Sequence, residues 1–387
     1  MKKTICIIYD VEFNENDING ACGGSETWAI QISKEFVRQG YNVIMVRPGD
    51  WVLTDNGVEY VPSHLLEYKI NSQYFEAVIF SRNIDIDRYK MIVESKCTKQ
   101  IYIQAHEIYI WKDGIYNLKY DYNYMCKHYP DITKYIALSD FHKQALNYYC
   151  NIPLDKIEII GNAADTDIYY KIDKELGDVN KIEKSILWTS CFGRGADILI
   201  DDILPMVKQY IPDFKVKICG YVDVMPDEYK NRNDVKIVGF NLTKEEYYKE
   251  LRKTPCWFYP CVTAETFNIA ALDAVLNNCD IVSPMLHGME YSMKPFKPLG
   301  MEHKFGTGET LNKNYDWGTY HTDKNSVEYN KACQEAARMI IESYGNYHEP
   351  IRNKVRKSFK NYILQEHSWQ NVVKKWTQMF KKYENED

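Results

Sequence analysis

The sequence predicts an α/β protein made of two successive doubly wound domains. Short apolar runs alternate with amphipathic helical stretches from one end of the chain to the other, which is the pattern of parallel sheets covered by helices. The chain has 387 residues, which exceeds the roughly 250–300 residues at which a single core stops growing. No short-period repeat interrupts this alternation. Two similar halves are therefore expected, one after the other.

The first half is predicted to extend over residues 1–168. Its expected strands are the short apolar runs Thr4–Tyr9, Asn42–Val46, Ala77–Phe80, Gln100–Gln104 and Lys134–Leu138. Its two clearest helical stretches, with apolar residues recurring every three to four positions, are Ser25–Gln39 and Asp140–Tyr149. The segment Tyr169–Lys184 is charged and lacks an apolar period, so it is predicted to be a linker.

The second half is predicted to extend over residues 185–365. Its expected strands are Ser185–Thr189, Lys215–Cys219, Val235–Val238, Cys256–Tyr259 and Ile281–Ser283. Its expected helices are Ala196–Gln209, Lys244–Arg252 and Phe267–Asn277. Ligands of such sheets bind outside the carboxyl ends of the strands, so the loops that follow the strands should carry the chemistry.

Composition excludes several classes of protein. The net charge of −6 gives no excess of positive charge for nucleic acid or anionic lipid. The opening apolar run, Thr4–Tyr9, is too short for a signal peptide, and no stretch approaches the roughly 20 apolar residues of a membrane span. The 11 cysteines are scattered without a Cys-x-x-Cys pair, which favours reduced core cysteines over disulfides or metal. A cytoplasmic protein is expected.

The stretch Tyr259–Asp280 is the most informative part of the sequence. Its helix reads IAALDAVL from Ile269 to Leu276, apolar on every side except Asp273. Such a helix is buried, and a lone buried carboxylate needs a partner. An internal arginine or a solvated edge would satisfy Asp273. Its spacing from Glu265 instead favours a ligand, because eight helical residues span roughly 12 Å, about the distance from ribose to hexose across a pyrophosphate. Amides at the helix start can hold phosphate between them, namely those of Thr266, Phe267 and Asn268.

Three other loops have residues suited to a ligand. Gly23 and Gly24 precede the first long helix, where glycines allow close approach of a phosphate or sugar, although simple capping explains them equally well. Arg194 precedes another helix, and a guanidinium there is suited to phosphate, or is an ordinary surface residue. His106 follows a strand and would orient hydroxyls or carry a proton near neutral pH, or serve a structural role.

The segment ETFNIAALD, from Glu265 to Asp273, resembles the motif P-x(3–4)-E-x-F-x(5)-E of the retaining glycosyltransferases of family 4. The resemblance implies the GT-B fold, in which two Rossmann-like, doubly wound domains face a central cleft. It also implies that the first domain, 1–168, is the acceptor side and that the second, 185–365, is the nucleotide-sugar donor side. It also implies that Glu265 contacts the donor sugar, that the amides after it hold the phosphates, and that Asp273 binds ribose hydroxyls. This chain has aspartate where the family has a second glutamate, so its carboxylate reaches about one methylene less far.

Other segments extend the resemblance over most of the chain. Gly23-Gly24-Ser25-Glu26 resembles the family's GGxE element, and Arg194 matches the later of two cations that bind the diphosphate, with Thr189 or Ser190 at the place of the earlier one. His106 lies where the family has a histidine near the donor sugar. Val238-Gly239-Phe240 is similar to the base-binding loop. Residues 159–165 are similar to the interdomain segment, and Ser368-Trp369 to the start of a tail, here 366–387, that returns to the first domain.

The resemblance thus implies sugar transfer, with retention, from a nucleoside diphosphate sugar such as a UDP- or GDP-sugar to a glycan or other hydroxyl acceptor, with no other cofactor and no metal. The expected catalytic residues are His106, Arg194 and Glu265; the expected donor-binding residues are Gly23, Gly24, Ser190, Arg194, Gly239, Phe240, Glu265, Thr266, Phe267, Asn268 and Asp273. An epimerase or phosphorylase on the same fold, or a non-catalytic sugar-nucleotide-binding protein, remains an alternative.

Three further features are weaker. Asp85-Ile86-Asp87 and Asp165-Thr166-Asp167 both read D-x-D, a metal signature of the other glycosyltransferase fold, and are interpreted as ordinary loop residues. The resemblance fades over residues 285–324, which are an acceptor loop or disordered. Four aromatic residues after His106 are candidates for stacking on sugar rings: Tyr109, Trp111, Tyr116 and Tyr120.

Overall fold

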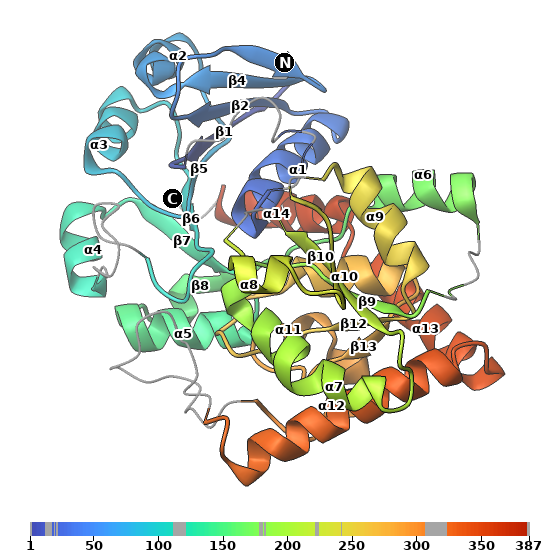
Figure 1. The fold of residues 1–387 in the computed structure, drawn as a ribbon. Helices are drawn as coiled ribbons and strands as arrows, with labels where there is room; N and C mark the ends of the chain where they lie inside the picture. The colour runs from blue at the N-terminus through green and yellow to red at the C-terminus, as the bar shows by residue number, and fades with distance from the viewer. Residues whose placement is uncertain are drawn as a thin grey trace. The chain divides into compact units, whose positions relative to one another are not determined.

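The computed structural model describes residues 2–11, 18, 20, 22–110, 121–177, 181, 183–220, 224–240, 242–305 and 323–384. Trp111, Tyr116, Tyr120 and residues 306–322 lie outside this set, and so do the expectations that concern them. The chain forms two compact units (Figure 1). The first consists of Met1–Ile18, Gly24–Asn162 and Trp369–Asp387, and the second of Asn19–Gly23 and Ala163–Ser368.

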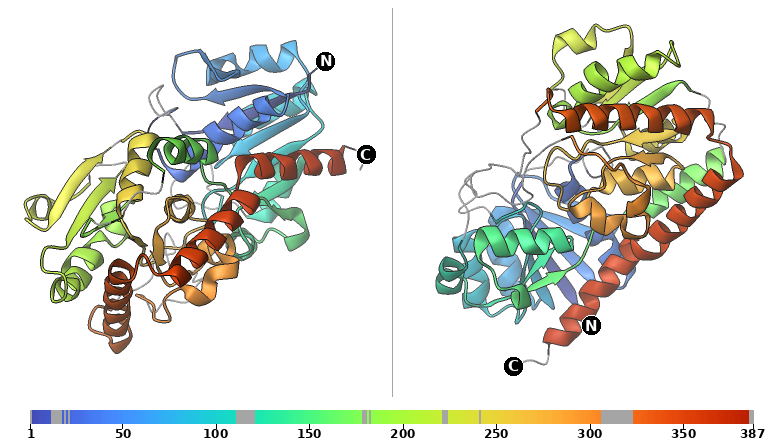
Figure 2. Two further views of the ribbon diagram at one scale, coloured as in Figure 1. Left: turned by 90° about the vertical axis from the view of Figure 1, so that its right-hand side faces the viewer. Right: turned by 90° about the horizontal axis from the view of Figure 1, so that it is seen from below.

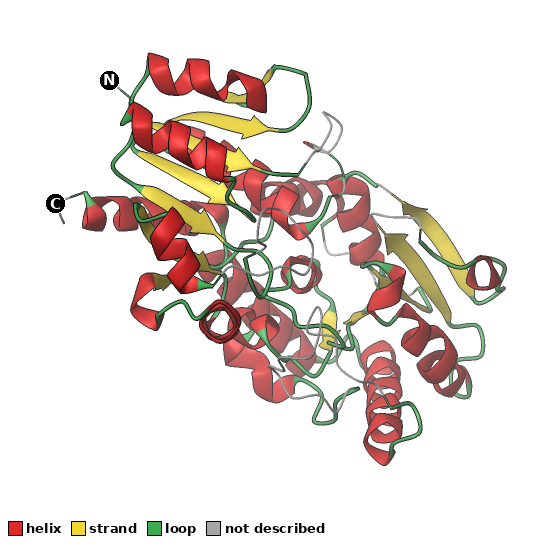
Figure 3. Ribbon diagram, turned by 90° about the vertical axis from the view of Figure 1, so that its left-hand side faces the viewer, coloured by secondary structure: helices red, strands yellow, loops and turns green. Residues whose placement is uncertain are grey.

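The first unit is built on an eight-stranded sheet with the order β3-β4-β2-β1-β5-β6-β7-β8. All pairs are parallel except β3 and β4, which form an antiparallel edge. Figure 3 shows the strands of the protein in yellow. The strand order reverses between β1 and β5. The strands are β1 (Thr4–Tyr9), β2 (Asn42–Arg47), β3 (Leu53–Asp55), β4 (Val58–Pro62), β5 (Ala77–Ser81), β6 (Ile101–Gln104), β7 (Ile132–Ala137) and β8 (Ile157–Ile159).

The helices of the first unit include one from the far end of the chain. They are α1 (Gly24–Arg38), α2 (Leu66–Ser72), α3 (Ile86–Ser95), α4 (Tyr122–His128), α5 (Asp140–Cys150) and α14 (Trp369–Tyr383). Helix α14 lies against α1 and places Trp376 beside Trp28, with ring centroids 6.3 Å apart. Its Phe380 stacks on Phe36 at 6.0 Å. This aromatic layer buries the strongly amphipathic face of α14 and fixes the C-terminal helix to the first unit.

The second unit is built on a five-stranded parallel sheet with the order β11-β10-β9-β12-β13. Its strand order reverses between β9 and β12. The strands are β9 (Ser185–Trp188), β10 (Lys215–Gly220), β11 (Val235–Phe240), β12 (Cys256–Phe258) and β13 (Asp280–Val282). Figure 2 shows the helices of this unit from two further sides. The described ones are α6 (Thr166–Leu176), α7 (Leu204–Lys208), α8 (Asp227–Lys230), α9 (Lys244–Lys253), α10 (Ile269–Leu276), α11 (Gly288–Ser292), α12 (Val327–Gly345) and α13 (Pro350–Glu366).

The predicted linker is wrong over residues 169–176, because these belong to helix α6. Asp165 caps this helix by accepting a hydrogen bond from the amide of Ile168 at 3.1 Å. Tyr169 and Ile172, three positions apart, form its buried face. Only these two of the eleven residues of α6 are buried. Two apolar positions are too few to give a recognisable helical period, so the sequence pattern did not predict this helix.

The segment predicted as one helix over Ala196–Gln209 is also different. Residues Ile198–Ile203 form a π-helical segment that continues into α7. Pro205 explains this widening, since proline has no N–H to donate and its ring clashes with a carbonyl one turn earlier. Within the described ranges, no helix combines the length and the apolar character that crossing a membrane requires.

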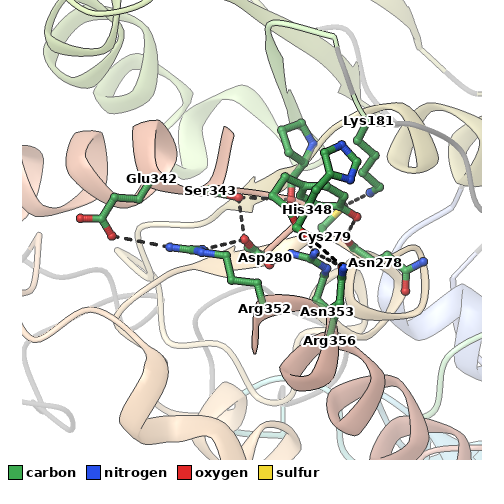
Figure 4. A network of polar contacts seen from close by, with 12 residues as sticks. Lys181, Asn278, Cys279, Asp280, Glu342, Ser343, His348, Arg352, Asn353 and Arg356 are labelled. Atoms are coloured by element: carbon green, nitrogen blue, oxygen red, sulfur yellow. Dashed lines mark hydrogen bonds and ion pairs between the residues drawn. The ribbon is translucent and has the colours of Figure 1, made fainter. Parts of the chain in front are cut away.

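Helices α12 and α13 are tied to the sheet through Asp280, the first residue of β13 (Figure 4). Its Oδ2 accepts from Ser343 at 2.7 Å and from Arg352 at 2.9 Å, and its Oδ1 accepts from Arg356 at 2.8 Å. This cluster lies at the amino end of its strand, the end opposite to the one where ligands of parallel sheets bind. Its role is therefore structural.

Candidate functional site

The second unit has a polar cluster where its strand order reverses, at the carboxyl ends of β9 and β12. A crevice for a ligand is expected at such a point, because the connections from the two strands leave in opposite directions. Arg194 follows β9, and Glu265 follows β12. These are two of the three residues that the sequence predicts as catalytic.

A tight turn presents Arg194 at this point. The residue ends a short 3-10 turn, Phe192–Arg194, and is followed by Gly195 in a left-handed conformation with φ of +106°. A Cβ atom on Gly195 would lie 2.6 Å from Cγ of Pro260, a distance that real structures do not show. Only glycine therefore fits here, both for the backbone angle and for the close packing of the turn against the loop after β12.

Glu265 is the centre of the cluster and has three described partners. Arg194 Nη1 lies 2.5 Å from its Oε1. The same oxygen accepts hydrogen bonds from the hydroxyl of Tyr259 and, at 3.2 Å, from that of Thr263. The Glu265 side chain is 13% exposed and that of Arg194 is 42% exposed. The carboxylate is therefore mostly buried among its partners, while the arginine side chain reaches solvent. This pairing of the two residues was not expected from the sequence.

Helix α10 starts later than predicted. It begins at Ile269, and Asn268 is its N-cap, whose side chain accepts from the amide of Ala271 at 3.0 Å. Thr266, Phe267 and Asn268 therefore precede the helix. The helical rise applies only from Ile269 to Asp273, roughly 6 Å at 1.5 Å per residue. The estimate of about 12 Å of helix between the two acids is thus wrong, because the first part of the segment is irregular.

The backbone around Glu265 is unusually strained. Four non-glycine residues near it have positive φ: Cys261 at 53°, Asn268 at 75°, Met285 at 44° and His287 at 59°. A Cβ on Gly288 would lie 2.1 Å from the backbone of Thr266, so the first residue of α11 packs directly on the loop that carries Glu265. Strain of this kind persists where the surrounding structure over-determines it, which is common at functional sites.

Asp273 is buried and has partners from α9. Its side chain is 2% exposed, Tyr248 donates to its Oδ1 at 2.5 Å, and Lys244 Nζ lies 3.4 Å from its Oδ2. Burial acts to lower the pKa of Lys244, but its negative neighbours, Asp273 foremost and Asp165 with it, together hold that pKa above its ordinary value. The prediction that Asp273 requires a partner is confirmed, although the partner is a lysine rather than an arginine.

Three further donor-binding candidates lie at the ends of β9 and β11. Gly239 and Phe240 are the last residues of β11, and a Cβ on Gly239 would lie 2.7 Å from a side-chain carbon of Leu242. Ser190 follows β9, and its carbonyl accepts from the indole of Trp188 at 2.9 Å. The structure thus places them at the carboxyl edge of the sheet and leaves their role toward a nucleotide as a prediction.

In the first unit, His106 lies just after β6 and is buried. Its Nε2 is 3.0 Å from the hydroxyl of Ser81, and its ring meets Trp28 edge-on at 5.1 Å. Burial, assisted by the positive charge of Arg82, holds its pKa well below the ordinary value. The imidazole is therefore neutral at pH 7, which favours a hydrogen-bonding role over the carriage of a proton.

A charged cluster in the first unit was missed in the sequence. It lies at the carboxyl ends of β1, β5 and β6 and consists of Asp10, Glu26, Arg82, Asn83 and Glu107. Arg82 contacts Glu107 at 3.3 Å and Glu26 at 3.9 Å. Its φ of +73° is strained for a non-glycine residue. The polar run Ser81-Arg82-Asn83 directly after an apolar strand was the available signal.

Gly23 and Gly24 lie where α1 begins. Gly24 is the first residue of this helix, and Gly23 precedes it. Glu26 is in the first turn, where a carboxylate is stabilised by the helix dipole. Within the GGxE element, Glu26 forms an ion pair with Arg82.

The two D-x-D segments are helix starts. Asp85 caps α3 by accepting from the amide of Arg88 at 2.9 Å, and Asp165 caps α6. Asp87 and Asp167 occupy the first turns of the same helices. A cap followed by a first-turn acid is a common helix signal, which explains both patterns. In the described part of the chain, no three His, Cys, Asp or Glu side chains are grouped as metal ligands would be.

Several solved structures are similar to this chain over nearly its whole length. A glycosyltransferase from Rickettsia africae has a TM-score of 0.68 at 14% identity, with all of both chains covered. Sucrose-phosphate synthase from Thermosynechococcus elongatus has a TM-score of 0.62 at 13% identity, over 98% of this chain and 99% of that one. HepE from Anabaena, in complex with UDP and glucose, has a TM-score of 0.59 at 13% identity, over 97% and 99%.

Searches of protein-family models and of curated proteins found no match to the chain. At 13–14% identity the structural likeness establishes the fold. The prediction from the sequence is confirmed at this level: the chain is an α/β protein of the GT-B fold, with two Rossmann-like domains, one built on a mostly parallel and one on a fully parallel sheet.

Proposed function

We propose that the chain is a glycosyltransferase that moves a hexosyl group from a nucleoside diphosphate sugar to a carbohydrate acceptor, with retention at the anomeric carbon. One observation carries the proposal: Arg194 and Glu265 meet where the strand order of the second sheet reverses. A cation suited to phosphate and a carboxylate suited to sugar hydroxyls thus lie side by side where parallel sheets bind their ligands.

In this proposal the protein acts mainly through electrostatics. The leaving group is a nucleoside diphosphate, on which negative charge grows as the glycosidic bond breaks. The Arg194 guanidinium is partly exposed and stabilises this charge, because a fixed cation near a developing anion requires no rearrangement during the reaction. Glu265, held by Tyr259 and Thr263, orients the sugar. The donor's own phosphate oxygen takes the acceptor proton.

Asp273 is proposed to hold the ribose of the nucleotide. Its contact with Lys244, at 3.4 Å, is long for a hydrogen bond, whereas Tyr248 donates at 2.5 Å. A carboxylate oxygen accepts more than one hydrogen bond. Ribose hydroxyls would therefore donate to the Asp273 carboxylate in addition to Tyr248 and would compete with Lys244 for its Oδ2. The lysine would remain nearby as a positive charge that balances the carboxylate.

A thermal-shift panel with UDP, GDP, dTDP and ADP, and with their sugars, tests the proposal. A ligand that binds only the folded protein raises its stability by about 2.7 kcal/mol at 100 times Kd. UDP is the first nucleotide to try, because HepE binds it. At least one nucleotide should raise the unfolding midpoint of the wild type. It should raise that of Arg338→Ala, an exposed control on α12, by the same amount, and that of Arg194→Ala by a smaller amount. If no nucleotide shifts the midpoint, the proposal is wrong.

A further inference from the structure

The cluster at the carboxyl ends of β1, β5 and β6 contains two buried acceptor atoms without a donor. The amide of Asn83 donates to Oδ2 of Asp10 at 2.7 Å. The other oxygens of this pair, Oδ1 of Asp10 and Oδ1 of Asn83, are buried and have no hydrogen-bond partner in the described part of the chain. The Asn83 residue is 6% exposed. Buried polar atoms are nearly always satisfied in native proteins, so this pair of oxygens requires donors from elsewhere.

The place of these oxygens indicates a ligand. Asp10 follows β1, Asn83 follows β5, and the order of the first sheet reverses between these two strands. Both residues therefore lie at the point where a doubly wound sheet opens a crevice. The neighbouring Arg82 has a positive φ of 73° and is anchored by its amide, which donates to the carbonyl of Gln104 at 2.9 Å. The edge of the cluster is thus held in a fixed and strained conformation.

The charge of the cluster selects between kinds of ligand. Asp10, Glu26 and Glu107 have three negative charges, and the two cations that act on Asp10, Arg82 and Arg88, have two positive charges, which leaves a formal charge of −1. Arg82 is already engaged with both glutamates. A phosphate or carboxylate on the ligand would be repelled here. Two neighbouring hydroxyl groups would instead donate one hydrogen bond to each free oxygen, without adding charge.

We propose that Asp10 and Asn83 bind a pair of neighbouring hydroxyl groups on a neutral carbohydrate, which is the acceptor if the chain is a glycosyltransferase. Each hydroxyl donates to one of the two oxygens, and the Asn83–Asp10 hydrogen bond keeps those oxygens at a fixed spacing. The identification as acceptor rests on the proposed function. The binding itself does not, since every residue involved belongs to the first unit.

Saturation-transfer NMR on the full chain tests the binding, with the methyl α-glycosides of glucose, galactose and mannose as probes. At least one should bind to the wild type and to Asn71→Leu, a matched control at an exposed asparagine of α2. Asn83→Leu should weaken that binding by about tenfold or more, the factor expected for losing one to two hydrogen bonds. Asp10→Asn keeps the side-chain shape and should also weaken glycoside binding. This variant tests the proposal if Asn83→Leu does not fold.

Any of four results would overturn the proposal. If none of the three glycosides binds, or if binding is unchanged in Asn83→Leu and Asp10→Asn, the two oxygens hold only water. Tighter binding of glucose 6-phosphate than of the methyl glucoside would contradict the charge argument. Tighter binding of methyl glucosaminide would assign the site to an ammonium group instead. The thermal shift caused by the nucleotide that binds the wild type should stay unchanged in both variants. Failure of the proposed function would instead mean that no nucleotide shifts the wild type, so the two failures are distinguishable.

Discussion

Replacing Asp273 with asparagine removes the carboxylate that forms an ion pair with Lys244 at 3.4 Å inside the second unit, and leaves Asp165 as a second negative charge that acts on this lysine. Breaking a buried ion pair by removing one partner costs about 3–5 kcal/mol. Lys244 remains 17% exposed, so water solvates part of the orphaned ammonium, and asparagine still accepts from Tyr248. We therefore expect the lower end of that range, about 3 kcal/mol.

This loss is large enough to measure by thermal unfolding. The second unit comprises about 200 residues, and each kcal/mol shifts the midpoint of a unit of this size by about 2–4 °C. Asp273→Asn without nucleotide should therefore unfold roughly 6–12 °C below the wild type. The double variant with Lys244→Met removes the unpaired charge as well and should recover part of the loss. Calorimetry or fluorescence of the unfolding transition measures both variants.

A midpoint within 2 °C of the wild type would refute this reasoning, since the carboxylate would then contribute no stability through Lys244. The same samples with nucleotide separate the two roles of Asp273. If the residue also binds ribose, the midpoint increase that the nucleotide causes should be smaller in Asp273→Asn than in the wild type. An unchanged increase would leave Asp273 with a structural role alone.

Three other substitutions test the local geometry. Gly195→Ala should lower stability by about 1–3 kcal/mol and reduce the nucleotide-induced shift, because its Cβ has no room and φ is positive; Gly193→Ala, whose Cβ meets nothing within 4 Å, should do neither, and equal effects would contradict the packing argument. Burial lowers the pKa of His142 to about 4, so the unfolded chain binds more protons between pH 6.5 and 4, and the free energy of unfolding falls by about 1.4 kcal/mol per pH unit as pH decreases there. Denaturant titrations at a series of pH values should show that the free energy of unfolding changes less per pH unit in His142→Asn than in the wild type. Tyr259→Phe should slow sugar transfer by about tenfold or more, since a hydrogen bond to the charged Glu265 is lost, while the nucleotide-induced thermal shift persists.

The strands were predictable where burial makes them uniformly apolar. Strand β1 was predicted with its observed bounds, and β2, β5, β9 and β10 to within a residue, because central parallel strands are covered on both faces. The missed strands β3, β4 and β8 lie at or beside the edges of the first sheet. There, polar residues interrupt the apolar run, as in Leu53–Asp55, and three-residue strands have no recognisable period.

The site was predictable residue by residue but not as a set of contacts. Arg194 and Glu265 were each recognised from their loops, yet they are 71 positions apart, and the ion pair between them depends on how β9 and β12 adjoin. The partners of Asp273 come from α9, which the sequence predicts as an ordinary amphipathic helix. The polar run after β5 showed that Arg82 lies at a strand end, but its contacts with Glu26 and Glu107 depend on a left-handed backbone that is unusual for arginine and cannot be predicted from the sequence.

The claim that Arg194 and Glu265 form a donor site is tested most directly by turnover of Arg194→Ala. Once a nucleotide sugar has been identified, its consumption with acceptor is measured for this variant, the wild type and the exposed control Arg338→Ala. The account predicts a loss on the order of 10²-fold in turnover for Arg194→Ala, by comparison with the removal of one donor that stabilises a developing anion, and no loss for the control. Wild-type turnover by Arg194→Ala would contradict it.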